Sequence, residues 1–307
     1  MSFERFEQEQ NLERAVERQQ LDKLYEYARA REAAGGRIRE SDFENYYGPD
    51  AVAKDRDYVE LRKRQFSESL ARLPEGERGD AEEARKLSYV MEMMLQEEGE
   101  LSEWFGRDAH TAMASEYDDI KNGVDAIVEF ETETGAEYLA LAVDFTLKRG
   151  SLDKIQRIKE DIDGGRTTEV KYFYSEYEKK QKPLKDLAKV VVTCDTSTLL
   201  EAAHLWKTKG RSPQAQRALA NHPIQLIILR EIQSQLEAYR AYAEKTGKVN
   251  FETMYAGDLA MIDAILGEKE GRADTLLNEK EGRILGNPTS DDAYRALARN
   301  LSVVFGK

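Results

Sequence analysis

Two short stretches decide the fold of this 307-residue chain: VDAIVEF at residues 124–130 and YLALAVDFT at residues 138–146. Both are dominated by apolar residues, and the turn-forming sequence Glu133-Thr134-Gly135 lies between them. Two such runs joined by a short loop that contains glycine are typical of an antiparallel β-hairpin. We therefore predict a β-sheet in the middle of the chain.

The residues after this hairpin predict further helices and strands. Apolar residues at helical spacing predict a helix over 151–163, which Gly164-Gly165 ends. Strands are expected at 169–174 and 189–195, and a helix from Thr196 to about Thr208. The order is then helix, strand, strand, helix, strand, strand, helix. This order predicts a mixed, helix-rich α/β core over residues 105–210.

Helical patterns flank the core on both sides. Residues 1–104 contain apolar stripes over 3–33, 50–72 and 81–105 and form an acidic helical module. Residues 211–307 contain similar stripes at about 223–245, 251–267 and 290–304. We expect this C-terminal segment to pack on the core, which gives three parts: 1–104, 105–210 and 211–307.

The composition excludes several classes of protein. The chain has 46 basic and 59 acidic side chains, a net charge of −13, one cysteine and three histidines. An internal disulfide is impossible, and a Cys/His zinc site is essentially excluded. No apolar run approaches the length of a membrane helix, and the N-terminus has no apolar signal core. We expect a soluble, cytoplasmic protein without a membrane partner.

The charges change sign abruptly along the core. Residues 101–146 carry 11 acidic and 2 basic side chains, whereas residues 147–217 carry 10 and 16. An acidic cluster beside a basic face suits a metal-dependent site for phosphate groups, and the basic stretch 147–217 could contact nucleic acid. Solvated faces of ordinary helices and strands would give the same pattern.

Carboxylates of the predicted hairpin are the candidate site. Asp125 opens the first strand and Asp144 lies near the end of the second, so an antiparallel pairing puts both at one edge of the sheet. Glu116 lies shortly before the first strand. Converging carboxylates suit Mg²⁺ or Mn²⁺, and we expect Glu116, Asp125 and Asp144 as metal ligands. Alternatively, Asp144 could pair with Lys148 or cap the helix that begins at Ser151.

These residues and the order of elements resemble the PD-(D/E)xK, or restriction-endonuclease-like, superfamily over roughly residues 105–207. The resemblance implies an αβββαβ-type core. It also implies that Asp125 and Asp144 bind metal, with Glu116 as the glutamate from a helix. A lysine two residues after the second acid helps to activate water in that superfamily. Thr146 stands at that place here.

Three lysines could replace the missing one. Lys148 would lie on the same face as Thr146 if the strand continues, and it is the preferred third catalytic residue beside Asp125 and Asp144. Lys154 lies in the first turn of the next helix. Lys171 belongs to the literal tripeptide Glu169-Val170-Lys171. If the 151–163 helix joins parallel strands, that tripeptide lies at the opposite edge from Asp144.

Two functions follow from these patterns. The first is a metal-dependent nuclease, or a nuclease-like protein that binds nucleic acid, with phosphodiester hydrolysis at an Asp125/Asp144 site that holds Mg²⁺ or Mn²⁺. The second is a catalytically inactive scaffold with the nuclease fold, which binds a protein partner through its helical flanks. The missing lysine and the net charge of −13 favour the second.

Overall fold

The computed structural model describes residues 3–34, 37–133, 135–144, 150–277 and 291–306. Its helices are α1 (Phe3–Ala33), α2 (Glu44–Tyr47), α3 (Pro49–Ala71), α4 (Glu75–Leu101), α5 (Glu116–Asn122), α6 (Gly150–Gly164), α7 (Thr196–Thr208), α8 (Pro213–Ala220), α9 (Ile224–Lys245), α10 (Val249–Leu277) and α11 (Asp292–Phe305). Two 3-10 turns, η1 (Glu40–Phe43) and η2 (Lys209–Arg211), precede α2 and α8. The strands are β1 (Ala109–Met113), β2 (Ala126–Thr132), β3 (Gly135–Val143), β4 (Thr168–Ser175) and β5 (Lys180–Val192). The predicted mixed α/β class is confirmed.

The five strands form one mixed sheet in the order β1-β2-β3-β5-β4. The predicted hairpin is present: β2 and β3 are antiparallel, with Ala126 opposite Leu141. Strand β1, which we did not predict, pairs antiparallel with β2. After α6 the chain returns to pair β5 parallel to β3, and β4 pairs antiparallel with β5. The strand that α6 connects in parallel to β3 is therefore β5 and not the 169–174 strand.

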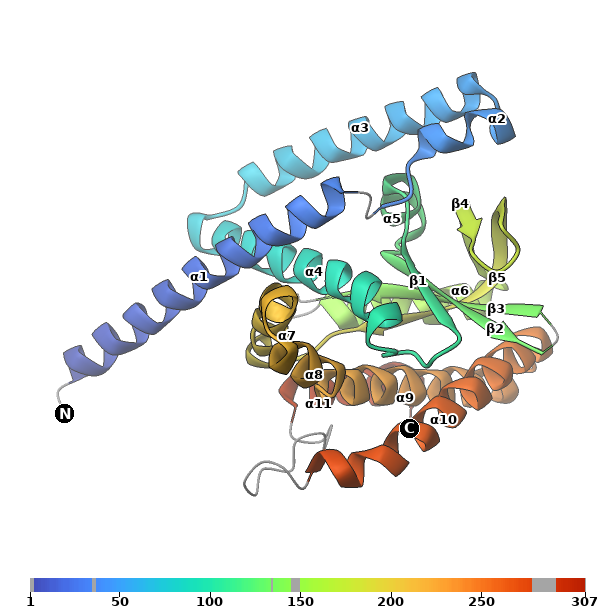
Figure 1. Cartoon of the computed structure of the whole chain (residues 1–307). Coiled ribbons are helices and arrows are strands. Elements are labelled where there is room, and N and C mark those ends of the chain that lie inside the picture. The colour runs from blue at the N-terminus through green and yellow to red at the C-terminus, as the bar shows by residue number, and fades with distance from the viewer. Residues whose placement is uncertain (1–2, 35–36, 134, 145–149, 278–290, 307) are drawn as a thin grey trace.

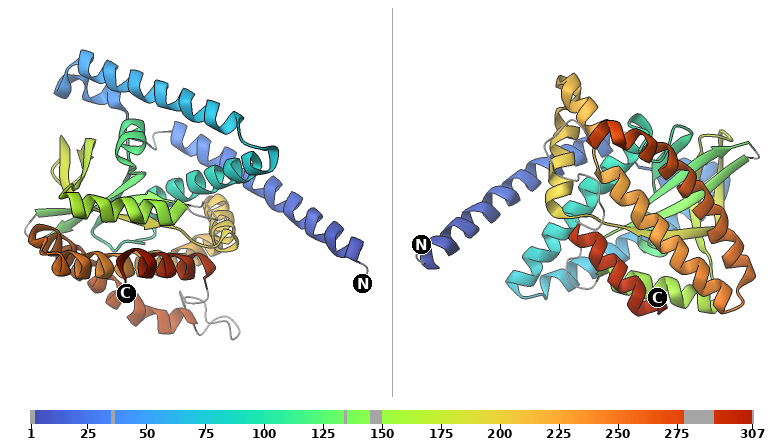
Figure 2. Two further views of the ribbon diagram at one scale, coloured as in Figure 1. Left: turned by 180° about the vertical axis from the view of Figure 1, so that it is seen from behind. Right: turned by 90° about the horizontal axis from the view of Figure 1, so that it is seen from below.

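One face of the sheet carries the main hydrophobic core. Side chains of β2, β3 and β5 on this face pack with those of α4, α7, α9 and α10 in one cluster that runs from Leu21 to Phe305. Residues from all three sequence segments share this core. Figures 1 and 2 show α9, α10 and α11 together on one side of the sheet, with α3 and α5 on the other, and α1 projecting away from the body.

The opposite face is smaller and partly polar. Ile127 and Ala140 pack there against Val170, Phe173 and two leucines of β5 in a second cluster. The alternation of side chains along β2 and β3 places Asp125 and Asp144 on this second face as well. The β4–β5 hairpin projects beyond this face, as Figure 1 shows.

Side chains of α9 satisfy the backbone where β5 extends beyond β4. Strand β4 pairs only as far as Leu187, whereas β5 continues to Val192. Gln235 pairs with Val191 like a neighbouring strand: its Oε1 accepts from the amide and its Nε2 donates to the carbonyl, both at 2.7 Å. Glu231 Oε2 accepts from the amide of Thr193 at 2.9 Å. These bonds replace the missing strand, because buried backbone groups require partners.

None of the helices among the described residues is long and apolar enough to cross a membrane.

Candidate functional site

The start of β2 and the end of β3 lie side by side at one edge of the sheet. The amide of Asp125 donates to Leu141 O at 2.9 Å, and Asp125 Oδ2 accepts from the amide of Val143 at 2.7 Å. Asp144 follows directly, and its amide continues the ladder to Val192 O at 2.9 Å. The two aspartates are only 9% and 5% exposed. The structure thus places both predicted carboxylates at the same edge.

Lys154 of α6 reaches this edge from the other side of Val143. Its Nζ donates to Val143 O at 2.7 Å. The Asp125 carboxylate and the Lys154 ammonium therefore flank the residue that precedes Asp144. Lys148, the preferred lysine, lies outside the described residues, as does Thr146.

Lys171 does not take part in this site. Its Nζ binds Asp55 of α3 at 2.5 Å and lies about 5 Å from the ring centres of Tyr47, Tyr117 and Tyr172. This contact fixes α3 to β4 through an ion pair and cation–π interactions. The literal Glu169-Val170-Lys171 match belongs to the packing of α3. The predicted reason for excluding it, a parallel strand that begins at the opposite edge from Asp144, is wrong, because β4 is antiparallel to β5 and β5 is parallel to β3.

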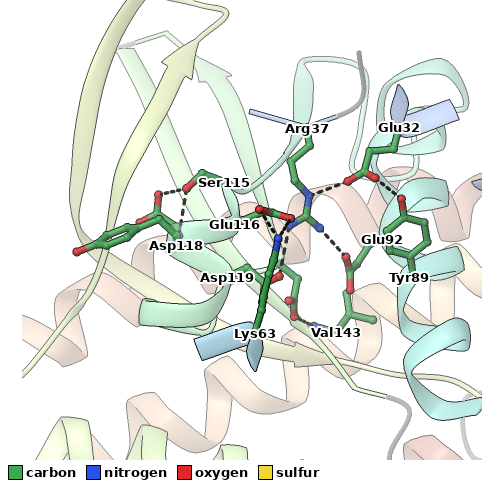
Figure 3. A network of polar contacts seen from close by, with 12 residues as sticks. Glu32, Arg37, Lys63, Tyr89, Glu92, Ser115, Glu116, Asp118, Asp119 and Val143 are labelled. Atoms are coloured by element: carbon green, nitrogen blue, oxygen red, sulfur yellow. Dashed lines mark hydrogen bonds and ion pairs between the residues drawn. The ribbon is translucent and has the colours of Figure 1, made fainter. Parts of the chain in front are cut away.

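Arg37 connects three carboxylates next to Asp125. Its guanidinium lies 3.1 Å from Glu32, 3.2 Å from Glu92 of α4 and 3.3 Å from Asp119 of α5 (Figure 3). Asp119 is in turn close enough to Asp125 to raise the pKa of that carboxyl group. The site therefore contains a chain of interactions from Arg37 through Asp119 to Asp125.

Burial and mutual repulsion raise the pKa of Asp125 and of Glu92. Burial, followed by the neighbouring Asp119, raises the pKa of Asp125 to about 7. Burial also raises the pKa of Glu92 well above its usual value, and Asp125 adds to this shift while Arg37 opposes it. A carboxyl with a pKa near neutrality is suited to accept and return a proton at physiological pH. Lys154 opposes the shift in the pKa of Asp125 because its positive charge favours the carboxylate.

Glu116 is turned away from this edge. It is the first residue of α5, and both of its carboxylate oxygens lie 2.7 Å from Lys63 Nζ of α3. The expected set of Glu116, Asp125 and Asp144 is not assembled among the described side chains, which contain no group of three or more His, Cys, Asp or Glu placed to bind a metal ion.

The other acidic residues of α5, Asp118 and Asp119, face different parts of the structure. Ser115 caps the helix, since its hydroxyl accepts from the amide of Asp118. The buried carboxylate of Asp118 accepts from the amides of Lys171 and Tyr172 at 2.8 and 3.0 Å and so protects the open edge of β4. Asp119, in contrast, faces the Asp125 site. Helical spacing explains this division, because consecutive residues point about 100° apart.

The arrangement of the described carboxylates does not fit a metal ion, although their chemistry does. Buried oxygen donors suit Mg²⁺ or Mn²⁺. However, Glu92 and Asp119 form ion pairs with Arg37, and Asp125 Oδ2 accepts a hydrogen bond from the amide of Val143.

Sequence reasoning missed Glu92 and Arg37. Glu92 did leave a signal: it interrupts the apolar run VMEMML at 90–95, where an isolated charge is costly unless it has a partner. No local sequence pattern marks Arg37 as a site residue. Its backbone is held near the site by one isolated β-bridge to Met113, which is distant in the sequence.

Comparison with known proteins identifies no relative: no family model, no curated protein and no solved structure matches the chain.

Proposed function

We propose that this chain is a nuclease-like protein that binds nucleic acid and hydrolyses phosphodiester bonds where β2 begins and β3 ends. Asp125, Asp144 and Lys154 are the residues that would act there, and Glu92 replaces Glu116 as the carboxylate from a helix. The series α4, β1, β2, β3, α6 and β5 would correspond to the restriction-endonuclease-like core, with β4 as an addition.

One observation supports this proposal above all. Asp125 Oδ2 and Lys154 Nζ each lie 2.7 Å from the backbone of Val143, one at its amide and one at its carbonyl. An acid with a pKa of about 7 and an ammonium group are thereby held at fixed positions beside Asp144. The carboxylate can accept the proton of an attacking water, and the ammonium can offset the charge that develops on the phosphate. The amine that the sequence lacks at 146 is supplied from α6.

A cleavage assay tests the proposal. The purified protein is incubated with single-stranded DNA, duplex DNA and RNA in EDTA, in Mg²⁺ and in Mn²⁺. Asp125→Asn and Lys154→Met are each expected to abolish cleavage, because one removes the proton acceptor and the other the positive charge. The matched control is Lys159→Met on the same helix, since Lys159 binds Asp163 and Tyr242 on the surface.

The pH profile gives a second readout. Cleavage should rise through about pH 7 as Asp125 loses its proton. Cleavage that persists in Asp125→Asn, or that is lost equally in Lys159→Met, would contradict the assignment of the site. The dependence on cation in the same assay decides whether Mg²⁺ or Mn²⁺ takes part.

Arg37 supports a second function, the inactive scaffold. Its guanidinium forms ion pairs with Glu32, Glu92 and Asp119 where a nuclease would bind cations. Helix α3 also exposes Leu61 and Phe66, which are 52% and 59% accessible and available to a protein partner. Absence of cleavage by the wild-type chain under every condition, together with an intact fold, is the outcome that favours this function.

A further inference from the structure

Most lysines of the basic stretch 147–217 are already paired with carboxylates. On the β4–β5 hairpin, Lys179 binds Glu176 at 2.8 Å, and Lys180 and Lys182 bind Glu178 at 3.4 and 2.6 Å. These pairs cancel most of the hairpin's charge. The hairpin is therefore a poor candidate for contact with a polyanion, although its lysines are prominent in the sequence.

Three cationic side chains beside the Asp125 site are not paired with carboxylates in the way that the hairpin lysines are. Lys154 and Arg157 lie one turn apart on α6, and Lys189 lies on β5 opposite them. Lys189 interacts electrostatically with Asp161 and then with Lys154, Asp125 and Arg157. Among the described residues, none of the three cations has a carboxylate within ion-pair distance.

Backbone carbonyls hold the two lysines in place. Lys154 Nζ donates to Val143 O at 2.7 Å, and Lys189 Nζ donates to Asn122 O at 3.0 Å. Both side chains are partly buried, and burial lowers the pKa of Lys189. Asp161 also faces Lys189, but its Oδ1 accepts from Arg166 Nε at 2.9 Å. No described carboxylate forms an ion pair with either lysine, although Asp161 and Asp125 act on Lys189 from farther away, so this cluster suits an anionic ligand.

We propose that Lys154, Arg157 and Lys189 form a phosphate-binding subsite for the backbone of a nucleic acid, next to the Asp125–Asp144 edge. This inference rests on the proposed function and names the surface by which the substrate is held. Within the subsite, Arg157 and Lys189 bind a phosphate that flanks the one attacked, while Lys154 is held at the Asp125–Asp144 edge by its bond to Val143 O. A chain with a net charge of −13 requires such a local positive site to bind a polyanion.

The test measures binding separately from cleavage. Fluorescence anisotropy of a short labelled DNA duplex is recorded in EDTA at several salt concentrations. Arg157→Gln/Lys189→Met should weaken binding and reduce the slope of log K against log[salt] by about 0.9, the change expected for the one DNA phosphate that these two residues bind. Lys179→Gln/Lys180→Gln, the control with the same change in charge, should leave the slope unchanged.

Two further measurements complete the test: the melting temperature of Lys189→Met and the binding of inorganic phosphate by the wild type. Lys189→Met removes a partly buried charge, so its melting temperature should equal or exceed that of the wild type, and weaker binding is then not unfolding. Equal weakening in both double variants would overturn the inference, as would wild-type slopes in Arg157→Gln/Lys189→Met or no binding by the wild type. Binding of inorganic phosphate alone, with no binding of DNA, would also refute a nucleic-acid subsite.

The two proposals can fail independently. Asp125→Asn should retain the wild-type salt slope, because Asp125 makes no contact that the subsite requires. Binding that depends on Arg157 and Lys189 without any cleavage supports the subsite and refutes hydrolysis. Cleavage that survives unchanged in Arg157→Gln/Lys189→Met supports hydrolysis and refutes the subsite.

Discussion

Asp258 of α10 should make the stability of the protein depend on pH, and Asp258→Asn should remove that dependence. The carboxyl group is 6% exposed, and its Oδ2 has no hydrogen-bond partner among the described residues. Burial, with a further contribution from Glu137 of β3, raises its pKa to about 7. An ionised carboxylate is therefore disfavoured in the folded chain relative to the unfolded one.

The size of the effect follows from the two pKa values. The ordinary value is 3.8 and the folded value is about 7, and each pKa unit corresponds to about 1.4 kcal/mol. Because the pKa is raised in the folded state, the carboxyl group is protonated in both states below pH 3.8 and does not lower the free energy of unfolding there. The penalty grows as the pH rises and is complete above about pH 7, where it amounts to about 4 kcal/mol. Between about pH 5.5 and 8.5 the free energy of unfolding of the wild type should fall by about 2 kcal/mol more than that of Asp258→Asn.

Urea unfolding followed by circular dichroism at the two pH values measures this difference. The constant cost of burying the asparagine amide cancels when each variant is compared with itself at the other pH. Asp263→Asn is the control, because Asp263 lies exposed on the same helix. The reasoning is refuted if wild type and Asp258→Asn lose the same free energy of unfolding over this range.

Four further substitutions test the packing and the site. Gly99→Ala should cost about 2 kcal/mol in a melting experiment, since a Cβ would lie 2.2 Å from Thr111 Oγ1, whereas Gly79→Ala on the same helix meets nothing within 4 Å and should stabilise by about 0.5–1 kcal/mol. Asp118→Ala should lower the free energy of unfolding by about 3 kcal/mol, because two amides of β4 lose their acceptor, and an unchanged value would show that water replaces the carboxylate. Calorimetry with Mg²⁺ or Mn²⁺ should detect no binding by the wild type, because the described carboxylates form no metal-binding group, and binding that Asp144→Asn abolishes would restore Asp144 as a metal ligand.

Local patterns in the sequence were sufficient for the hairpin and for most helices. The two apolar runs at 124–130 and 138–146, with a turn signal between them, depend only on neighbours in the chain. The same holds for α6, which occupies 150–164 where 151–163 was predicted. Because the start of one hairpin strand always lies beside the end of the other, the shared edge of Asp125 and Asp144 also followed from the sequence.

Only the tertiary structure decided which strand pairs with β3 and which charges surround Asp125. A strand pattern does not state its partner, so the parallel pairing of β5 rather than β4 depended on how α6 packs. Arg37, Glu92 and Asp119 come from three separate segments, and Lys189 from a fourth. Their meeting is set by the burial of α4, α5 and α6 against the sheet, a long-range effect of the hydrophobic core. Local sequence contains no record of such contacts, because the free energy that enforces them arises only when the distant segments are packed together.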